Sequence, residues 1–174
     1  MMIPTMPPTP IIQASWREAL AWRPPCDPGA QKPDPHLLAA VLLALPAWLG
    51  MGLWAAAALR APVGLWAWIS LTLLMPLLEE LVFRGLLQGQ LLRVTALHSQ
   101  PRRIGPITWA NGLCTLAFVA LHLPTQPLPW ALAVAVPSLV FGHLRERFDS
   151  VWPAVGVHAL YNTGFAFTAW LTKV

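Results

Sequence analysis

The fold of this chain follows from residues 77–87, which read Leu77-Leu78-Glu79-Glu80-Leu81-Val82-Phe83-Arg84-Gly85-Leu86-Leu87. Three charged side chains interrupt an otherwise apolar run. On a helix Glu79 and Glu80 diverge by about 100°, whereas Glu80 and Arg84 share a face and can form an ion pair. That pairing lowers the cost of placing these charges in lipid and leaves Glu79 free for another role. An ionisable residue at membrane depth indicates a functional site.

The composition is that of a membrane protein. Of 174 residues, 56% are hydrophobic and 10% are charged, and the mean hydropathy is +0.57; soluble domains are about 25% charged. Ten tryptophans against one tyrosine fit a chain that meets two bilayer interfaces. The net charge of +4 comes from basic residues scattered between apolar runs, so membrane topology explains it better than nucleic-acid binding. The two cysteines, Cys26 and Cys114, predict neither a disulfide nor a thiol protease.

Five uncharged runs of 16 to 23 residues predict about five transmembrane helices in an all-α, polytopic bundle. The second run continues as a helix through the charged stretch to about Val94. We expect the prolines at positions 46, 76 and 137 to kink these helices rather than end them. The runs are Leu37–Leu59, Val63–Leu78, Ile104–Leu123, Leu128–Leu144 and Val151–Thr172.

The chain divides into three parts. Residues 1–35 form a proline-rich tail, in which Ile11–Trp22 fits a short interfacial helix and a disordered segment about equally well. Residues 36–62 form an anchor helix, and residues 63–174 form a four-helix core.

Lysine and arginine are distributed unevenly over the connections. Eight lie in the tail and in the second and fourth connections, whereas Arg60 and Lys173 lie on the other side. Because basic residues concentrate on the cytoplasmic side of a membrane protein, the N-terminus is predicted to be cytoplasmic.

Two more polar clusters interrupt the apolar runs. Phe118 and His122 lie one turn apart at the end of the third run, and His158 and Asn162 lie one turn apart in the fifth. The second and third predicted helices are antiparallel neighbours. At about 1.5 Å per residue from their connected ends, Glu79 and His122 reach a similar depth. His158 lies only about 10 Å from the start of its helix. The hairpin of helices two and three must therefore project further into the cytoplasm, and the third helix ends short of the outer surface.

The order of these motifs resembles a known family. Glu-Glu-x-x-x-Arg at Glu79, Glu80 and Arg84 is followed by Phe-x-x-x-His at Phe118 and His122 and by His-x-x-x-Asn at His158 and Asn162. The pattern is similar to the CPBP family of glutamate-dependent intramembrane proteases, which are related to type II CAAX prenyl endopeptidases and to bacteriocin-processing and abortive-infection proteins. The resemblance covers roughly residues 64–168 and includes Phe83-Arg84-Gly85 and residues 150–154. The short chain is closest in size to the myxosortase-like branch.

The resemblance assigns roles that suit peptide hydrolysis, which needs a base to activate water and donors to stabilise an oxyanion. It implies that Glu79 is the general base, with His122 positioning the water. It implies that His158 and Asn162 stabilise the oxyanion. The remaining motif residues, Glu80, Arg84 and Phe118, are supporting: Glu80 and Arg84 form a structural pair, and an added role for Glu80 in orienting His158 stays open.

A metal site is the alternative for the same residues. Glu79, His122 and His158 are chemically suitable zinc ligands. No helix carries His-Glu-x-x-His, however, and the three ligands would come from three helices. We expect a metal-free site without a cofactor.

The function implied is endopeptidase cleavage of a membrane-associated protein or peptide, as in C-terminal processing or removal of a sorting tail. The expected location is a bacterial inner membrane, and no nucleic-acid partner is expected. A non-catalytic binding or immunity protein of the same fold is the alternative, and it would tolerate Glu79→Gln. A proton-coupled transporter would predict an internal repeat, which the sequence lacks.

Overall fold

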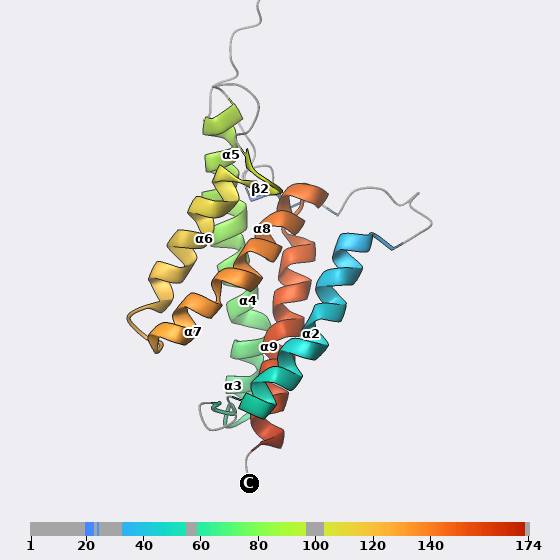
Figure 1. The fold of residues 1–174 in the computed structure, drawn as a ribbon, viewed down its shortest axis with the longest axis vertical. Helices are drawn as coiled ribbons and strands as arrows, with labels where there is room; N and C mark the ends of the chain where they lie inside the picture. The colour runs from blue at the N-terminus through green and yellow to red at the C-terminus, as the bar shows by residue number, and fades with distance from the viewer. Residues whose placement is uncertain (1–19, 23, 25–32, 55–58, 97–102, 173–174) are drawn as a thin grey trace, which may run out of the picture.

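The computed structural model describes residues 20–22, 24, 33–54, 59–96 and 103–172. These residues form a bundle of helices with one small hairpin, as Figure 1 shows, so the expected all-α architecture is confirmed. The elements are α2 (Pro35–Trp54), α3 (Leu65–Ile69), η3 (Ser70–Leu74), α4 (Met75–Glu80), η4 (Leu81–Leu87), α5 (Gln88–Ala96), β1 (Arg103–Ile104), β2 (Ile107–Thr108), α6 (Trp109–His122), α7 (Leu128–Ala133), α8 (Ala135–Phe148) and α9 (Trp152–Leu171).

Three helices in the described part of the chain are long and apolar enough to cross a membrane: Pro35–Leu53, Leu65–Thr95 and Leu128–Phe148. The helix α9 has 20 residues but is not among them. The helix α6 has 14 residues and is therefore about 21 Å long, less than the roughly 30 Å of a hydrocarbon core. The count of about five spans stays a prediction.

The predicted start of the third helix, at Ile104, is wrong. Residues Arg103–Ile104 and Ile107–Thr108 pair as antiparallel strands, and Gly105 at the turn has a φ of 60°, which glycine adopts readily. Thr108 then caps α6, because its hydroxyl accepts a hydrogen bond from the Asn111 amide at 3.0 Å. The helix therefore begins at Trp109 rather than at Ile104.

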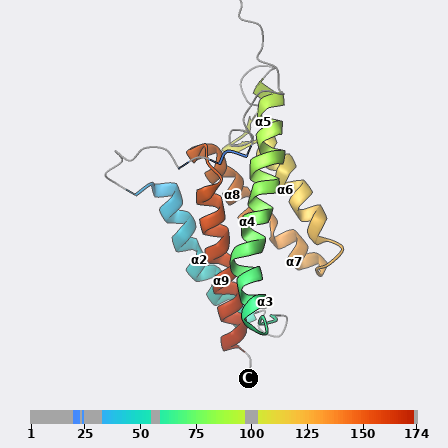
Figure 2. The same ribbon diagram turned by 180° about the vertical axis from the view of Figure 1, so that it is seen from behind.

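The segments α3, η3, α4, η4 and α5 form one long helix, drawn in green in Figures 1 and 2. Two of its segments are π-helical, with amide bonds to the carbonyl five residues earlier, as from Met75 to Ser70 and from Gln88 to Phe83. Pro76, which has no amide hydrogen, lies two residues after the end of the first of them. The predictions that Pro46 and Pro76 lie inside continuous helices are confirmed.

The fourth run is divided at Val134, between α7 and α8. A proline ring clashes with the carbonyl four residues earlier. For Pro137 that residue is Ala133, where α7 ends. The backbone stays helical at Val134, and Leu128–Phe148 forms one apolar helix with an irregular turn at this point. Figures 1 and 2 show the α6–α7 connection stopping well short of the lower ends of α3 and α9. This agrees with the prediction that the third helix ends early.

The connections group at the two ends of the bundle as expected. The start of α2, the end of α5, the β-hairpin and the α8–α9 turn lie toward the upper end in Figure 1, and the start of α3 and the end of α9 lie at the lower end. The helix α5 extends beyond the α8–α9 turn, as the helix lengths predict. Which end faces the cytoplasm stays a prediction.

The helix α9 lies between α2 and α4 in both views and packs against α2, α8 and α4. Gly164 sets the approach of α2, because a Cβ at this position would overlap the indole ring of Trp48. The indole nitrogen of Trp48 donates to the Tyr161 carbonyl at 3.3 Å. The helix that carries His158 and Asn162 is therefore held from several sides.

The predicted interfacial helix Ile11–Trp22 lies outside the described residues except for its last three. In these, Ala21 is buried and its carbonyl accepts a hydrogen bond from the Val151 amide at 3.2 Å. Trp22 meets Trp152 edge to face, with ring centroids 4.4 Å apart. The end of the tail thus contacts the start of α9.

We predict that Gly164→Ala lowers the melting temperature in detergent, because the added methyl group displaces Trp48 and breaks its hydrogen bond. Gly156→Ala is the matched control: it lies on the same helix, is exposed and has no heavy atom within 4 Å of the added Cβ. The control should melt at or slightly above the wild-type temperature, because alanine favours a helix by about 0.5–1 kcal/mol over glycine. Equal melting of the two variants would show that the α2–α9 contact is not tight.

Candidate active site

The adjacent glutamates Glu79 and Glu80 have different surroundings. The Glu80 side chain is fully buried, whereas 21% of the Glu79 side chain remains exposed. This follows from their divergence by about 100° on α4. Only the Glu79 carboxylate is open to water or to a substrate.

Glu80 and Arg84 form the predicted ion pair, with Oε2 and Nε 3.2 Å apart and both side chains at least 99% buried. A second helix, α8, helps to satisfy the arginine: its Nη2 donates to the Ser138 carbonyl at 2.9 Å and to the Ser138 hydroxyl at 2.8 Å. A buried charge pair is tolerated when such additional bonds complete it.

The network continues into α6. The Ser138 hydroxyl donates to Thr115 at 3.0 Å, and the Asn111 amide donates to the Leu139 carbonyl at 3.0 Å. Asn111 also fits against Gly142, where any Cβ would overlap its side chain. These polar contacts join α6 to α8, next to the helix that carries the glutamates.

His158 on α9 joins the two glutamates. Its Nδ1 lies 2.8 Å from Oε1 of Glu80, and its Nε2 lies 3.8 Å from Oε2 of Glu79. Because the Glu80 carboxylate is paired with Arg84 and can only accept, Nδ1 must carry the proton of this hydrogen bond. Glu80 therefore has both roles considered from the sequence: it pairs with Arg84 and it orients His158.

His122 lies at the last position of α6, and its Nδ1 is 2.8 Å from the Phe118 carbonyl of the same helix. A carbonyl only accepts, so Nδ1 donates and Nε2 of the neutral ring keeps its lone pair. The Phe118 ring lies against this imidazole, with centroids 4.6 Å apart. Both His122 and His158 interact electrostatically with the Glu79 carboxylate, so the structure brings all three together.

Asn162 lies one turn beyond His158 on α9. Its side-chain Nδ2 donates to the Leu71 carbonyl at 3.0 Å. Leu71 belongs to the π-helical segment η3, and such segments occur frequently at functional sites. The bond uses one of the two N–H groups of the amide, fixes its plane and leaves the second for another acceptor.

The same residues include side chains that can bind a metal ion. In the described residues, no group of three or more histidine, cysteine, aspartate and glutamate side chains is arranged to hold one. Both imidazoles already use Nδ1 within the protein. Neither the metal-free site nor the zinc alternative at Glu79, His122 and His158 is decided by this arrangement.

Sequence reasoning missed two residues next to this centre. Gln88 is fully buried and donates to the Gly142 carbonyl at 3.0 Å and to Glu146 at 2.8 Å. The sequence did indicate Gln88, because the polar residues at positions 80, 84 and 88 are spaced every four residues and so share a helix face. Phe141 stacks on His158, with centroids 4.7 Å apart and an interplanar angle of 17°. No motif marked it, because an apolar residue in an apolar helix carries no pattern of its own.

One of three comparisons with known proteins found a match. The family described as type II CAAX prenyl endopeptidase, Rce1-like, matches residues 60–164, a range that contains Glu79, His122, His158 and Asn162. Comparisons with curated proteins and with solved structures found no match. The family match covers more than half of the chain and confirms the resemblance seen in its motifs. The chain belongs to the type II CAAX prenyl endopeptidase Rce1-like family, a family of membrane proteases.

Proposed function

We propose that this protein is an intramembrane glutamic endopeptidase that hydrolyses a peptide bond near the C-terminus of a membrane-associated protein or peptide. One observation carries the proposal. Of two adjacent glutamates, Glu80 is fully buried and bound to Arg84 and His158, whereas Glu79 is partly exposed beside the same histidine. A carboxylate that water can reach, beside a group that can hydrogen-bond the substrate, is suited to act as a general base.

In the proposed reaction, the Glu79 carboxylate takes a proton from a water molecule. The Nε2 lone pair of His122 accepts a hydrogen bond from that water and holds it. The water oxygen bonds to the carbonyl carbon of the substrate, and the carbonyl oxygen becomes an oxyanion. When the C–N bond breaks, the proton held by Glu79 passes to the leaving amine. The new carboxylate and the free amine complete the hydrolysis.

The oxyanion requires hydrogen-bond donors. Asn162 can supply its second N–H. His158 can supply Nε2–H only as an imidazolium, because Nδ1 already gives its proton to Glu80. Glu80 holds Nδ1 of this ring, which assigns Glu80 a positioning role. No step in this scheme needs a metal, and we propose that the site works without one. The expected bacterial inner membrane and the sorting-tail substrate are part of the same proposal.

We predict that Glu79→Gln abolishes processing and that His122→Ala abolishes or strongly reduces it. The measurement compares the peptide termini of membrane and secreted proteins by mass spectrometry in the native host. Cells carry wild type, either variant, or the control His143→Ala, which changes a histidine bonded to His36 and outside the site. Expression is matched by immunoblot.

Specific C-terminal fragments should disappear in both site variants and persist in the control. The lost termini would then name the substrate, and a peptide spanning the cut should still be cleaved by purified protein in a strong chelator. Unchanged termini, together with rescue of a deletion phenotype by Glu79→Gln, would instead identify a binding protein. Loss of cleavage in chelator with recovery on added zinc would replace the metal-free scheme.

We predict that His158 contributes a hydrogen bond to the oxyanion. His158→Gln should cleave more slowly than wild type, because its amide can donate a hydrogen bond but from a different position, and His158→Ala should cleave more slowly still, because it donates none. The measurement is cleavage of the identified peptide by protein in liposomes. Equal rates in wild type and His158→Ala would contradict the role given to this imidazole.

We predict strong coupling between Glu80 and Arg84. Removing one partner of a buried pair costs about 3–5 kcal/mol, because the other charge is left uncompensated. Glu80→Gln and Arg84→Met should each lower the melting temperature in detergent, and the double variant should melt above either one. If the decreases in melting temperature of the two single variants simply add in the double variant, Glu80 and Arg84 are not energetically coupled, and other groups balance the charge of Arg84.

A further inference from the structure

A hydrogen bond at one nitrogen does not by itself aim an imidazole. The bond from Nδ1 of His158 to Glu80 fixes one point of the ring, and the ring plane can still turn about that contact. The opposite nitrogen, Nε2, faces Glu79 at 3.8 Å, too far for a hydrogen bond to hold it there. A second constraint is therefore needed to fix the plane.

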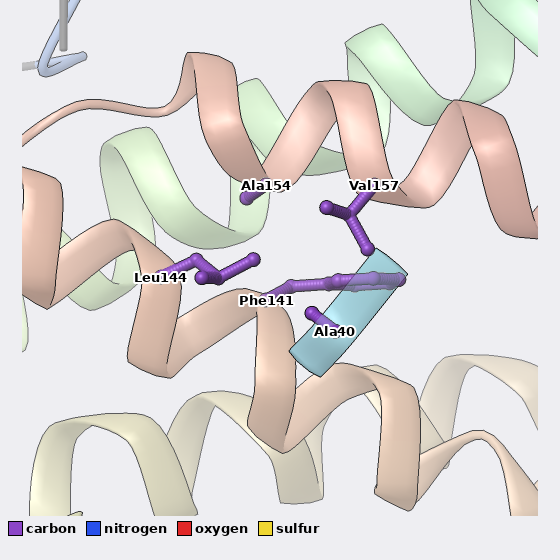
Figure 3. Packing of buried hydrophobic residues seen from close by; sticks show 5 residues of the cluster. All are labelled: Ala40, Phe141, Leu144, Ala154 and Val157. Carbon is purple, nitrogen blue, oxygen red and sulfur yellow. The ribbon is translucent and has the colours of Figure 1, made fainter. Parts of the chain in front are cut away.

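Phe141 on α8 supplies such a constraint. Its ring is 1% exposed and lies nearly parallel to the His158 ring, at 17° and 4.7 Å. On other sides Phe141 packs in a tight cluster of small and aliphatic side chains. Figure 3 shows its ring extending from α8 toward Val157 of α9 and over Ala40 of α2, with Leu144 and Ala154 beside it. The ring has little room to move, so it can hold the imidazole plane.

Arg84 links this stack to the other histidine. Its guanidinium carbon lies 5.0 Å from the centre of the Phe118 ring and 5.6 Å from that of Phe141. Its Nη1 is buried and has no hydrogen-bond acceptor in the described residues. Cation–π contacts of this kind contribute about 0.5–2 kcal/mol. Phe118 backs His122 at 4.6 Å as Phe141 backs His158, so each histidine rests on a phenylalanine that Arg84 contacts.

We propose that Phe141 is a positioning residue of the active site, which holds the plane of His158 so that Nε2 points at the reacting atoms beside Glu79. Arg84 lies between Phe118 and Phe141 and keeps each ring against its histidine. The consequence for catalysis rests on the proposed function. The consequence for the orientation of His158 does not, and it can be measured without a substrate.

The test uses Phe141→Met, which keeps an apolar side chain of similar volume but removes the ring. Protein with isotope-labelled histidine is examined by NMR in detergent micelles, where the signals of the five histidines are separated and His158 is assigned with His158→Gln. Wild type should show one ordered state of His158, with a single set of ring-nitrogen signals and a proton on Nδ1. Phe141→Met should show averaged ring nitrogens or broadened signals, because the imidazole then samples several planes.

Two controls separate orientation from loss of packing. Leu144→Ala removes fully buried volume from the same cluster and should lower the melting temperature, yet it should leave the single set of His158 ring signals intact. Phe148→Met makes the same exchange on the same helix, at a residue that packs against the cluster. It should behave as wild type in the NMR measurement.

On the peptide identified above, Phe141→Met should lower kcat by about ten- to 100-fold with KM little changed, as expected for a misplaced catalytic group. The controls should keep kcat per folded molecule. A single set of ordered His158 ring signals in Phe141→Met would overturn the proposal, as would the same averaging in Leu144→Ala. If wild type cleaves no peptide, the proposed function fails, and the His158 ring signals still decide the role of Phe141.

Discussion

The bundle depends on the burial of one ion pair, Glu80 with Arg84. Two opposite charges with almost no exposed surface are costly to bury, and hydrogen bonds from neighbouring helices offset part of that cost. Ser138 binds the arginine from α8, and His158 binds the glutamate from α9. The pair therefore dictates which helices surround α4 and at what height. The same contacts leave Glu79, one residue away, as the carboxylate that faces outward, so the stability of the fold and the accessibility of the site have a common origin.

Arg84 of this pair contacts the rings of Phe118 and Phe141, and these rings in turn pack against His122 and His158. Both imidazoles use Nδ1 inside the protein, to the Phe118 carbonyl and to Glu80, and Nε2 of His158 faces Glu79. The groups that hold the two rings differ, because a neutral backbone carbonyl holds His122 and a buried carboxylate holds His158. Two residues of the same type are therefore positioned by acceptors of different charge.

Much of this arrangement could be predicted from the sequence, because charged and polar residues are conspicuous in apolar helices. The Glu80–Arg84 pair and the helix contacts of Asn111, Thr115 and Ser138 follow from spacing and from the cost of polar groups in lipid. The π-helical segments could not be predicted, since no residue type specifies them. The start of α6 was missed because Ile104 and Ile107 are as apolar as a helix would be. Phe141 was missed because its role comes only from its place beside His158.

The shortness of α6 affects the solvent around the site. A helix of about 21 Å beside helices that span about 30 Å creates a hydrophobic mismatch, and lipid next to it must thin or give way to water. His122 is the last residue of that helix. A local depression of the membrane at this point would carry bulk water down to the imidazole. A protease whose second substrate is water would then need no channel through its own core.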